Sequence, residues 1–432
     1  MKKQFIFILC GLFLCAGTIA ATDYNVLQQG VVGDGKTLNT QSLQSAIDAL
    51  HAKGGGQLYF PAGRYLTGSL QLKSNVTLYL EKEAMLLGST SPYDYPGFST
   101  EKELKVNNDH FDQALIYAEG AENIGITGEG CIDGQGRELA LTIDSLHHTG
   151  ELVDKHYNTY RKRPNTRPKL LFMRNCRKVE LRKTNFRSGA AWGLSFSLCV
   201  DLTIDSLHVE NRAYWNNDGI DISDCKDVRI SNCFINSADD GICLKSHNRG
   251  AWNDRVSISN CHIISSASAI KFGTESLGGF KNVTIDNIRI KDTFRSAIAI
   301  ESVDGAEIEN VKLENIEIVC PGRATRGMAY MSVSRLKDVP ENEKGYPEFT
   351  MFEELPSWGF YVRHVKGIQM HNVKLRLQED DFRPAFVFDR VSDVRLSDIS
   401  LPENKKAGQV VLQQTSLQSA DNAVKEYVRE VE

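Results

Sequence analysis

The sequence predicts an all-β fold, a parallel β-helix whose successive coils stack on one another. Four segments share one pattern: a polar residue, a small residue, and then two apolar residues separated by any residue. They begin at Asp218, Asp240, Ser268 and Ser296, so the pattern recurs every 22 to 28 residues. An alternation of two indicates strands with one buried face. One such strand per 22 to 28 residues is typical of a solenoid.

A second pattern marks the start of each coil. It reads polar, aliphatic, any residue, aliphatic, as in Asp201-Leu-Thr-Ile204 and Asp227-Val-Arg-Ile230. A β-sandwich with alternating strands is the alternative, but it has no reason to keep this phase over ten units. The units begin, less strictly in places, at residues 75, 123, 178, 201, 227, 255, 282, 307, 367 and 393.

Both ends of the chain have features of their own. Residues 1–21 carry two lysines, an apolar run and a final Ala20-Ala21, which predicts a secretory signal peptide. The run is short for a bilayer span, so we expect an exported protein, periplasmic or extracellular, with no membrane span. Residues 39–50 predict a short amphipathic helix that caps the open end of the solenoid. The tail from Ser416 to Glu432 is expected to be a weakly packed helix.

Residues 22–432 are expected to form a single domain. Two stretches interrupt the repeat, at 137–168 and 320–360, and long loops in a regular fold often build the binding site. Plain insertions at coil corners are the alternative. We expect a monomer.

Composition excludes some functions and partners. The formal net charge is −5, and a nucleic-acid-binding surface would be strongly basic, so no nucleic-acid partner is expected. Eight cysteines follow the signal, several at matching points of the repeat, which favours buried free thiols over disulfides. No histidine or cysteine grouping has the spacing of a metal site, so neither a metal nor another cofactor is expected.

The repeat brings three carboxylates together. Stacking places Asp218 beside Asp240 on the neighbouring coil, about 4.8 Å away, with Asp239 next to them. Three such groups cannot all ionise easily, so at least one pKa should rise. A protonated acid beside an ionised base is what glycosidic bond cleavage requires. An Asp-rich turn or a calcium site is the structural alternative.

These motifs resemble glycoside hydrolase family 28, the polygalacturonases and their relatives. The likeness runs from about Asp23 to about residue 400. It rests on Gly33-Asp-Gly-Lys36, Gly54 to Pro61, Gly128-Glu-Gly130, Ile132-Asp-Gly-Gln-Gly136, Asn217-Asp-Gly-Ile-Asp221 and Ala238-Asp-Asp-Gly241. The resemblance implies a right-handed parallel β-helix that hydrolyses pectin-type, galacturonate-containing glycans. It also implies that Asp239 is the general acid, that Asp218 and Asp240 activate water, and that the anomeric carbon is inverted.

Two family motifs are absent. Ala267-Ser268-Ala269 stands where Gly-His-Gly belongs, and Ala299-Ile300-Glu301 stands where Arg-Ile-Lys belongs. The family uses that arginine and lysine to hold the uronate carboxylate.

The rows of the solenoid offer replacement cations. The row of the lost arginine reads Asp221, Cys243, Lys271, Ala299, and the row of the lost lysine reads Ser223, Lys245, Gly273, Glu301. We therefore expect Lys245 and Lys271 to bind an acidic sugar in a shifted subsite. Glu301 is expected to pair with Lys271 or to accept sugar hydroxyls, and an outward salt-bridge row without a ligand is the alternative. Further substrate-binding candidates are Asn217, His247 and Arg249, and Trp215 either stacks on a sugar or packs in the core.

The long loop at 320–360 could block one end of the cleft, which would favour exo action. The residues on or near it that could close the cleft are Arg323, Arg326, Arg363 and His364, and a structural role is the alternative for Arg363 and His364. Two other functions stay open. A polysaccharide lyase on the same fold would use Lys271 as the base and the three aspartates as a calcium site. A non-catalytic carbohydrate-binding solenoid would keep the scaffold without turnover.

Overall fold

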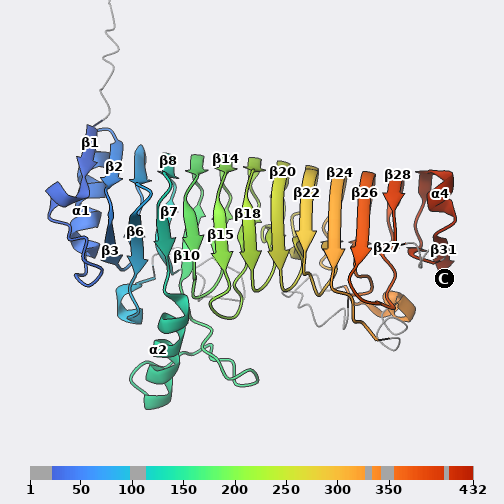
Figure 1. The fold of residues 1–432 in the computed structure, drawn as a ribbon, viewed down its shortest axis with the longest axis horizontal. Coiled ribbons are helices and arrows are strands. Elements are labelled where there is room, and N and C mark those ends of the chain that lie inside the picture. Colours follow the sequence, from blue (N-terminus) through green and yellow to red (C-terminus); the bar gives the residue numbers. More distant parts are fainter. Residues whose placement is uncertain (1–21, 98–112, 326–332, 342–354, 403–407, 432) are drawn as a thin grey trace, which may run out of the picture.

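The computed structural model describes residues 22–97, 113–325, 333–341, 355–402 and 408–431. These residues form the predicted right-handed parallel β-helix, an elongated stack of coils with α1 at one end and α4 at the other (Figure 1). Strands of neighbouring coils pair in parallel, so residues one coil apart in sequence are neighbours in space. The signal peptide predicted for residues 1–21 lies outside the described residues.

The strands form two sheets, here called sheet A and sheet B. Sheet B supplies one strand per coil: β4 (Leu70–Gln71), β7 (Ala114–Glu119), β10 (Lys169–Arg174), β13 (Leu194–Ser197), β16 (Ile220–Ser223), β19 (Ile242–Ser246), β21 (Ile270–Ser276), β23 (Ile298–Glu301), β25 (Phe360–Arg363), β27 (Phe386–Asp389), β29 (Val410–Gln413) and β31 (Val428–Val431).

Sheet A bends around the rest of each coil. Its strands are β1 (Thr22–Asn25), β2 (Gly56–Phe60), β3 (Gly63–Thr67), β5 (Val76–Leu80), β6 (Ala84–Gly88), β8 (Glu122–Thr127), β9 (Cys131–Asp133), β11 (Arg177–Arg182), β12 (Asn185–Arg187), β14 (Val200–Asp205), β15 (His208–Asn211), β17 (Lys226–Ser231), β18 (Phe234–Ser237), β20 (Asn253–Ser265), β22 (Phe280–Lys291), β24 (Ile308–Cys320), β26 (Val365–Leu377), β28 (Ser392–Ser400) and β30 (Leu417–Ala420).

The core follows from the alternation of two. Ile220, Ile242, Ile270 and Ile298 are fully buried and stack on successive strands of sheet B. The small residue before each of them is required because the coils approach closely. A Cβ placed on Gly219 would lie 2.4 Å from the carbonyl oxygen of Gly241.

The bend within sheet A is built by asparagines. Asn232, Asn260 and Asn287 have φ values of 56°, 53° and 52°, a left-handed conformation that asparagine tolerates better than most residues. Their side chains form a row along the stack, with Asn260 donating to Asn232 at 3.3 Å and Asn287 donating to Asn260 at 2.8 Å. The row satisfies amide groups that would otherwise compete with the strands.

The predicted cap is confirmed. Helix α1 (Thr40–Ala52) buries Leu43, Ile47 and Leu50 against the first coil. The side chain of Asn39 does not cap the helix; its Oδ1 accepts from the backbone N–H of Val32 at 2.8 Å instead. Further helical segments in the described part of the chain include η1 (Val26–Gln29), η2 (Pro92–Asp94), α2 (Gly136–Thr149), η4 (Leu336–Asp338) and α4 (Asn422–Lys425).

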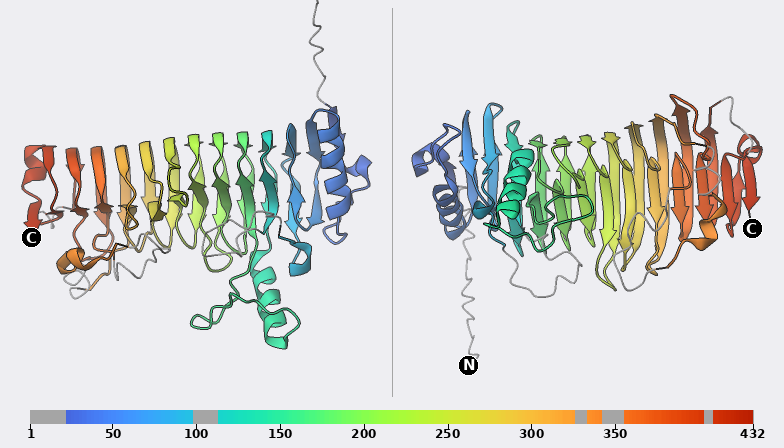
Figure 2. Two further views of the ribbon diagram at one scale, coloured as in Figure 1. Left: turned by 180° about the vertical axis from the view of Figure 1, so that it is seen from behind. Right: turned by 90° about the horizontal axis from the view of Figure 1, so that it is seen from below.

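Two predictions about local structure are corrected. The interruption at 137–168 is not all loop, because it begins with α2, which projects from the side of the stack with the loop that follows it (Figure 2). The tail is not a helix, because β30 and β31 add to the two sheets and only Asn422–Lys425 is helical. The eight cysteines after residue 21 are free thiols, as predicted. In the described part of the chain, no helix has the length and apolar character needed to cross a bilayer.

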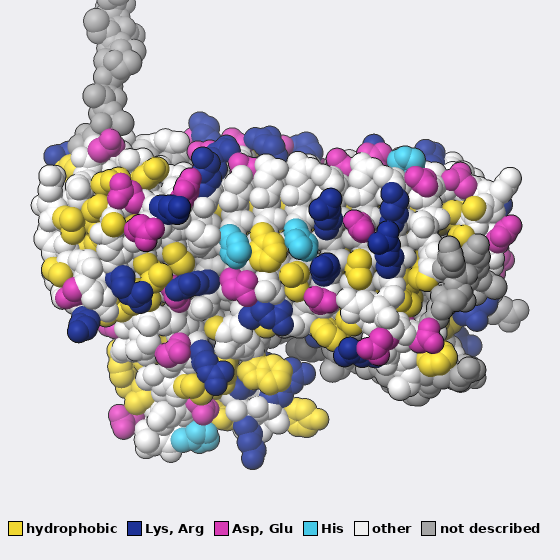
Figure 3. All heavy atoms as spheres, viewed as in Figure 1, with side chains coloured by type: hydrophobic (Ala, Val, Ile, Leu, Met, Phe, Trp, Pro, Cys, Tyr) yellow, Lys and Arg dark blue, Asp and Glu magenta, His cyan; other side chains and the backbone are white. Residues whose placement is uncertain are grey.

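The surface carries both signs of charge. On the face seen in Figure 3, lysine and arginine side chains are interspersed with aspartates and glutamates, and neither sign covers a continuous area.

Candidate active site

The site is built on the outer side of sheet B, over β16, β19, β21 and β23. The register places Asp221 beside Cys243, Cys243 beside Lys271, and Lys271 beside Ala299, as the sequence rows predict. The second row holds only in part. Ser223 lies beside Lys245, but the pairing of β19 with β21 shifts between Leu244 and Ser246.

The three predicted carboxylates lie at the entrance to β16 and β19. Asp218 and Asp240 precede these strands at equivalent positions, since the N–H of Gly219 donates to the carbonyl of Asp240 at 2.9 Å. The N–H of Asp239 donates to the carbonyl of Asn217 at 3.2 Å, which fixes the pair of coils in register. Stacking therefore brings the three side chains together on one wall.

Their environments differ. Asp218 and Asp240 are 4% and 3% exposed, whereas the side chain of Asp239 is 25% exposed. Asp239 is thus the carboxyl group of the three that a ligand can reach most easily. Its backbone is held firmly, because its carbonyl accepts hydrogen bonds from Ser237 Oγ at 2.9 Å and Ser265 Oγ at 2.6 Å.

The pKa values of the three groups are driven apart. Burial raises the pKa of Asp218 well above its usual range, and the charges of Asp221 and Asp239 raise it further. Burial and the charge of Asp240 also raise the pKa of Asp239. Asp240 goes the other way: burial opposes its ionisation, but Lys271 and two further cations bring its pKa below the usual range. Asp240 is therefore the most readily ionised of the three carboxyl groups, and its two neighbours favour the protonated form.

Lys271 makes this separation possible. Its Nζ lies 3.2 Å from Oδ2 of Asp240, and its side chain is 7% exposed. Of the two roles expected for Glu301, the pairing with Lys271 is not found, because the ion-pair partner of Lys271 among the described residues is Asp240. The N–H of Ser268 donates to Oδ1 of Asp240 at 3.2 Å and supports the ionised form.

Lys245 is also a buried ion-pair partner. Its Nζ lies 3.8 Å from Oδ1 of Asp221, with the two side chains 3% and 1% exposed. Burial raises the pKa of Asp221 to about 6, and Lys245 and Lys169 oppose that rise. Lys245 and Lys169 also flank the ring of Trp192, each Nζ being 4.8 Å from the ring centroid.

The other predicted ligands lie at different depths. Asn217 is fully buried, and its amide donates to the carbonyls of Gly189 at 2.9 Å and Ala191 at 2.7 Å. It therefore positions the backbone before Asp218. His247 Nε2 lies 3.6 Å from Glu275 Oε2, and burial with nearby lysines lowers the pKa of His247 to about 3. Arg249 is exposed in the turn after β19.

Arg295 is a site residue that sequence reasoning missed. Its Nη1 lies 3.9 Å from Oδ1 of Asp239, and the two side chains are 27% and 25% exposed. The signal was present in the repeat: the residues just before the four aligned segments are Asn217, Asp239, Ala267 and Arg295. Arg295 therefore shares the row of Asp239, two coils away.

The insertion after α2 is joined by hydrogen bonds to the segment that leads to Asp218. Arg167 is 2% exposed and donates through Nη1 to the carbonyls of Ala190 and Trp215, both at 2.6 Å, and through Nη2 to Oδ1 of Asn216 at 3.1 Å. Arg163 also donates to Oδ1 of Asn216. Trp215 is 50% exposed, and the guanidinium group of Arg163 lies 5.4 Å from its ring centroid.

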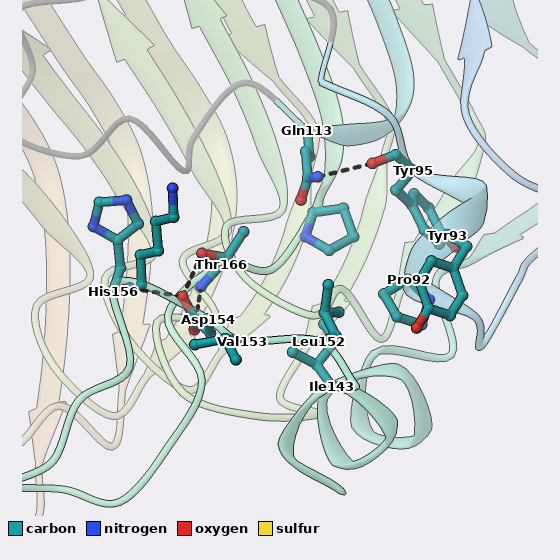
Figure 4. Close-up of a pocket in the computed structure, with 12 residues that line it drawn as sticks. Pro92, Tyr93, Tyr95, Gln113, Ile143, Leu152, Val153, Asp154, His156 and Thr166 are labelled. Carbon is teal, nitrogen blue, oxygen red and sulfur yellow. Dashed lines mark hydrogen bonds between the residues drawn. The ribbon is translucent and has the colours of Figure 1, made fainter. Parts of the chain in front are cut away.

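The insertion has a pocket of its own, of about 300 Å³, between η2 and the chain after α2 (Figure 4). Asp154 organises this segment by accepting hydrogen bonds from Thr166, Asn165 and His156. The pocket contains none of the predicted site residues.

The described part of the 320–360 interruption covers sheet B beyond β23. Leu336 of η4 is 2% exposed and packs with Val303, Tyr361 and Val387. Arg363, which follows Glu301 in the register, donates to Asp389 and to Glu341 at 2.6 Å. Arg326 and residues 342–354 lie outside the described residues.

The fold is a parallel β-helix, and the pKa values of its clustered carboxyl groups are driven in opposite directions. Together these features are typical of a glycoside hydrolase. Residues 56–320 match the family model described as glycosyl hydrolases family 28. The chain belongs to that family.

Named relatives agree with this assignment. A protein named "Probable polygalacturonase" from Vitis vinifera is 30% identical over 299 residues, covering 65% of this chain and 55% of the relative. The "Exo-poly-alpha-D-galacturonosidase" of Dickeya chrysanthemi is 27% identical over 248 residues, covering 50% of this chain and 41% of the relative. The chain thus spans about half the length of these curated relatives.

A solved structure shares the fold. The exopolygalacturonase of Thermotoga maritima superposes with a TM-score of 0.58 at 21% identity, covering 92% of this chain and 87% of that one.

Proposed function

We propose that the protein is an exported hydrolase of glycosidic bonds in pectin-type, galacturonate-containing glycans. Residues 22–432 form its catalytic domain, and residues 1–21 direct export to the periplasm or beyond the cell. The substrate is an acidic poly- or oligosaccharide, and the enzyme acts as a monomer. The observation that carries the proposal is the partly exposed Asp239 beside an Asp240 that Lys271 keeps ionised.

The three carboxylates have separate roles in this proposal. Asp239 protonates the departing glycosidic oxygen, because it is partly exposed and its pKa is raised. Asp240 accepts a proton from the attacking water, because its lowered pKa keeps the carboxyl group ionised and free to take up that proton. Asp218, on the neighbouring coil, helps to position the same water molecule. The attack of this water inverts the anomeric carbon.

Exo action is part of the proposal. The packing of η4 over Val303 and Tyr361 closes the outer face of sheet B directly beyond Glu301. A cleft with one closed end accommodates a chain terminus more readily than a continuous polymer. The names of the Dickeya and Thermotoga relatives are consistent with this mode.

Lys271 and Lys245 take a modified role. Each lies in a buried ion pair with an aspartate, so we propose that they set the charge of the acids rather than contact the uronate directly. This also disfavours the lyase alternative, in which Lys271 would be the base. Burial lowers the pKa of Lys271, but Asp240, Cys243 and Glu301 together raise it above its usual range, so Lys271 stays protonated. The test is incubation with pectic oligosaccharides: new reducing ends without an unsaturated product support hydrolysis, and ultraviolet absorbance from a new double bond supports the lyase.

A further inference from the structure

Glu301 has no structural partner that explains its burial. Its side chain is 1% exposed, and neither carboxylate oxygen accepts a hydrogen bond within the described structure. A buried carboxyl group without donors is costly, and such a group often awaits a ligand.

The side chain lies on the catalytic side of its strand. A Cβ placed on Gly273, one coil nearer to Asp240, would lie 3.7 Å from Cγ of Glu301. The atom nearest to that Cβ would be the carbonyl oxygen of Glu301 at 2.8 Å, so glycine at position 273 permits the close approach of the two coils at Glu301. The neighbours that act on Glu301 electrostatically are Lys271, Asp240, Arg295 and Arg363.

The nearest buried cations are already neutralised. Lys271 lies 3.2 Å from Asp240, and Arg363 donates to Asp389 and Glu341. Glu301 is thus an additional acidic group rather than half of an ion pair. Burial raises its pKa to about 7, so above that pH Glu301 is ionised and adds a negative charge that accepts hydrogen bonds.

We propose that Glu301 selects an uncharged sugar unit, rather than a uronate, at the subsite above β21 and β23. A hydroxyl group can satisfy the carboxyl oxygens, whereas a uronate carboxylate would meet a like charge in a buried site. The unit is either a neutral sugar or a uronate whose carboxyl is esterified. The inference rests on the proposed function, and it specifies the substrate of that same site.

Binding tests this inference without turnover. In an Asp239→Asn background and above pH 7, where Glu301 is ionised, calorimetry compares trigalacturonate with its fully methyl-esterified form, in which each negative charge is replaced by a neutral methyl ester. We expect the ester to bind about tenfold more tightly or better. Glu301→Gln should remove most of this preference, and Glu301→Lys should invert it. Glu317→Lys is the matched control, since Glu317 is 42% exposed on sheet A, and it should leave the ratio unchanged.

Tighter binding of the free acid by the Asp239→Asn protein would overturn the inference, as would one ratio for all Glu301 variants. If Glu301→Lys does not fold, the ratio of the two affinities measured for Glu301→Gln is sufficient to test the inference. Hydrolysis of pectic oligosaccharides by the wild-type protein is measured separately. If the wild-type protein hydrolyses pectic oligosaccharides but the Asp239→Asn protein shows no preference for the ester, only this inference is rejected. If the Asp239→Asn protein binds neither ligand, the result counts against the proposed function too.

Discussion

Nζ of Lys271 lies 3.2 Å from Oδ2 of Asp240, and both side chains are more than nine-tenths buried. The two residues come from neighbouring coils, so the repeat itself creates the pair. The lysine keeps one carboxylate ionised within a cluster that otherwise favours protonated acids. The division of acid and base among three similar side chains depends on this contact.

Lys271→Met should destabilise the fold by about 3–5 kcal/mol, because it leaves a buried carboxylate without its cation. Adding Asp240→Asn should restore much of that loss, because the buried charge is then removed as well. Urea unfolding of the two single variants and the double variant measures the coupling. If the losses of unfolding free energy in the two single variants add up in the double variant, Lys271 and Asp240 do not interact directly.

The same pair predicts behaviour in acid. The folded-state pKa of Asp240 lies below its ordinary value of 3.8, so its stabilisation is full above that value. It is lost as pH falls through the folded pKa. The stability difference between wild type and the double variant should therefore shrink in acid, and a difference that does not depend on pH would count against the assignment.

The effect of Glu301 on stability should change with pH in the direction opposite to that of Asp240. Its folded-state pKa is raised from 4.5 to about 7, so the native state holds a proton that the unfolded chain has lost within that window. Wild-type stability should fall relative to Glu301→Gln as pH rises from about 4.5 to about 7. Thermal unfolding across this range provides the measurement. Glu275, also raised to about 7, is present in both proteins and cancels in the comparison.

Much of this arrangement was predictable because a solenoid converts sequence spacing into spatial rows. The cap over Leu43 and Ile47 and the approach of Asp218 to Asp240 both follow from periodicity. Helix α2 was missed because an insertion need not follow the period of the coils. The strands of the tail were missed because β31 is short and gains its hydrogen bonds by pairing with β29.

The ion pairs of the site were harder to predict. A row gives the order of side chains but not which way a long side chain turns, so it offers Glu301 as a candidate partner of Lys271 and does not point to Asp240. The register shift between Leu244 and Ser246 cannot be read from residue types. Arg295 was within reach of the alignment but falls in a turn, outside the strand pattern.

Arg295→Gln should move the alkaline limb of the kcat profile to higher pH. Arg295 lowers the pKa of Asp239, so its removal lets the acid keep its proton further into the alkaline range. Arg289→Gln is a suitable control, because Arg289 is 74% exposed on sheet A. An unchanged alkaline limb would argue that Asp239 is not the group that titrates in the reaction.

Arg167→Met should reduce both stability and kcat. The change leaves the carbonyls of Ala190 and Trp215 without their buried donor, at a cost of about 2 kcal/mol or more. It also loosens the segment that leads to Asp218. Arg212→Met is the comparison, since the exposed Arg212 also donates to a backbone carbonyl, that of Ser237 at 2.6 Å, and should cost less. Equal losses of stability and kcat in the Arg167→Met and Arg212→Met proteins would show that the insertion does not support the site.

Asp239→Asn should lower kcat by about 10²–10⁴-fold, because asparagine cannot supply the proton that the leaving group needs. Its effect on unfolding should be small, since the side chain is partly exposed. Asp201→Asn, at a 47% exposed carboxylate on sheet A, should leave kcat unchanged. Near-normal hydrolysis by Asp239→Asn would remove this residue from the role of acid.

The most direct test of inverting hydrolysis is the stereochemistry of the first product, followed by proton NMR as a pectic oligosaccharide is cleaved. We expect that the anomer opposite to the original linkage appears first and then mutarotates. A first product that retains the original configuration, or one that carries a new double bond, would contradict it.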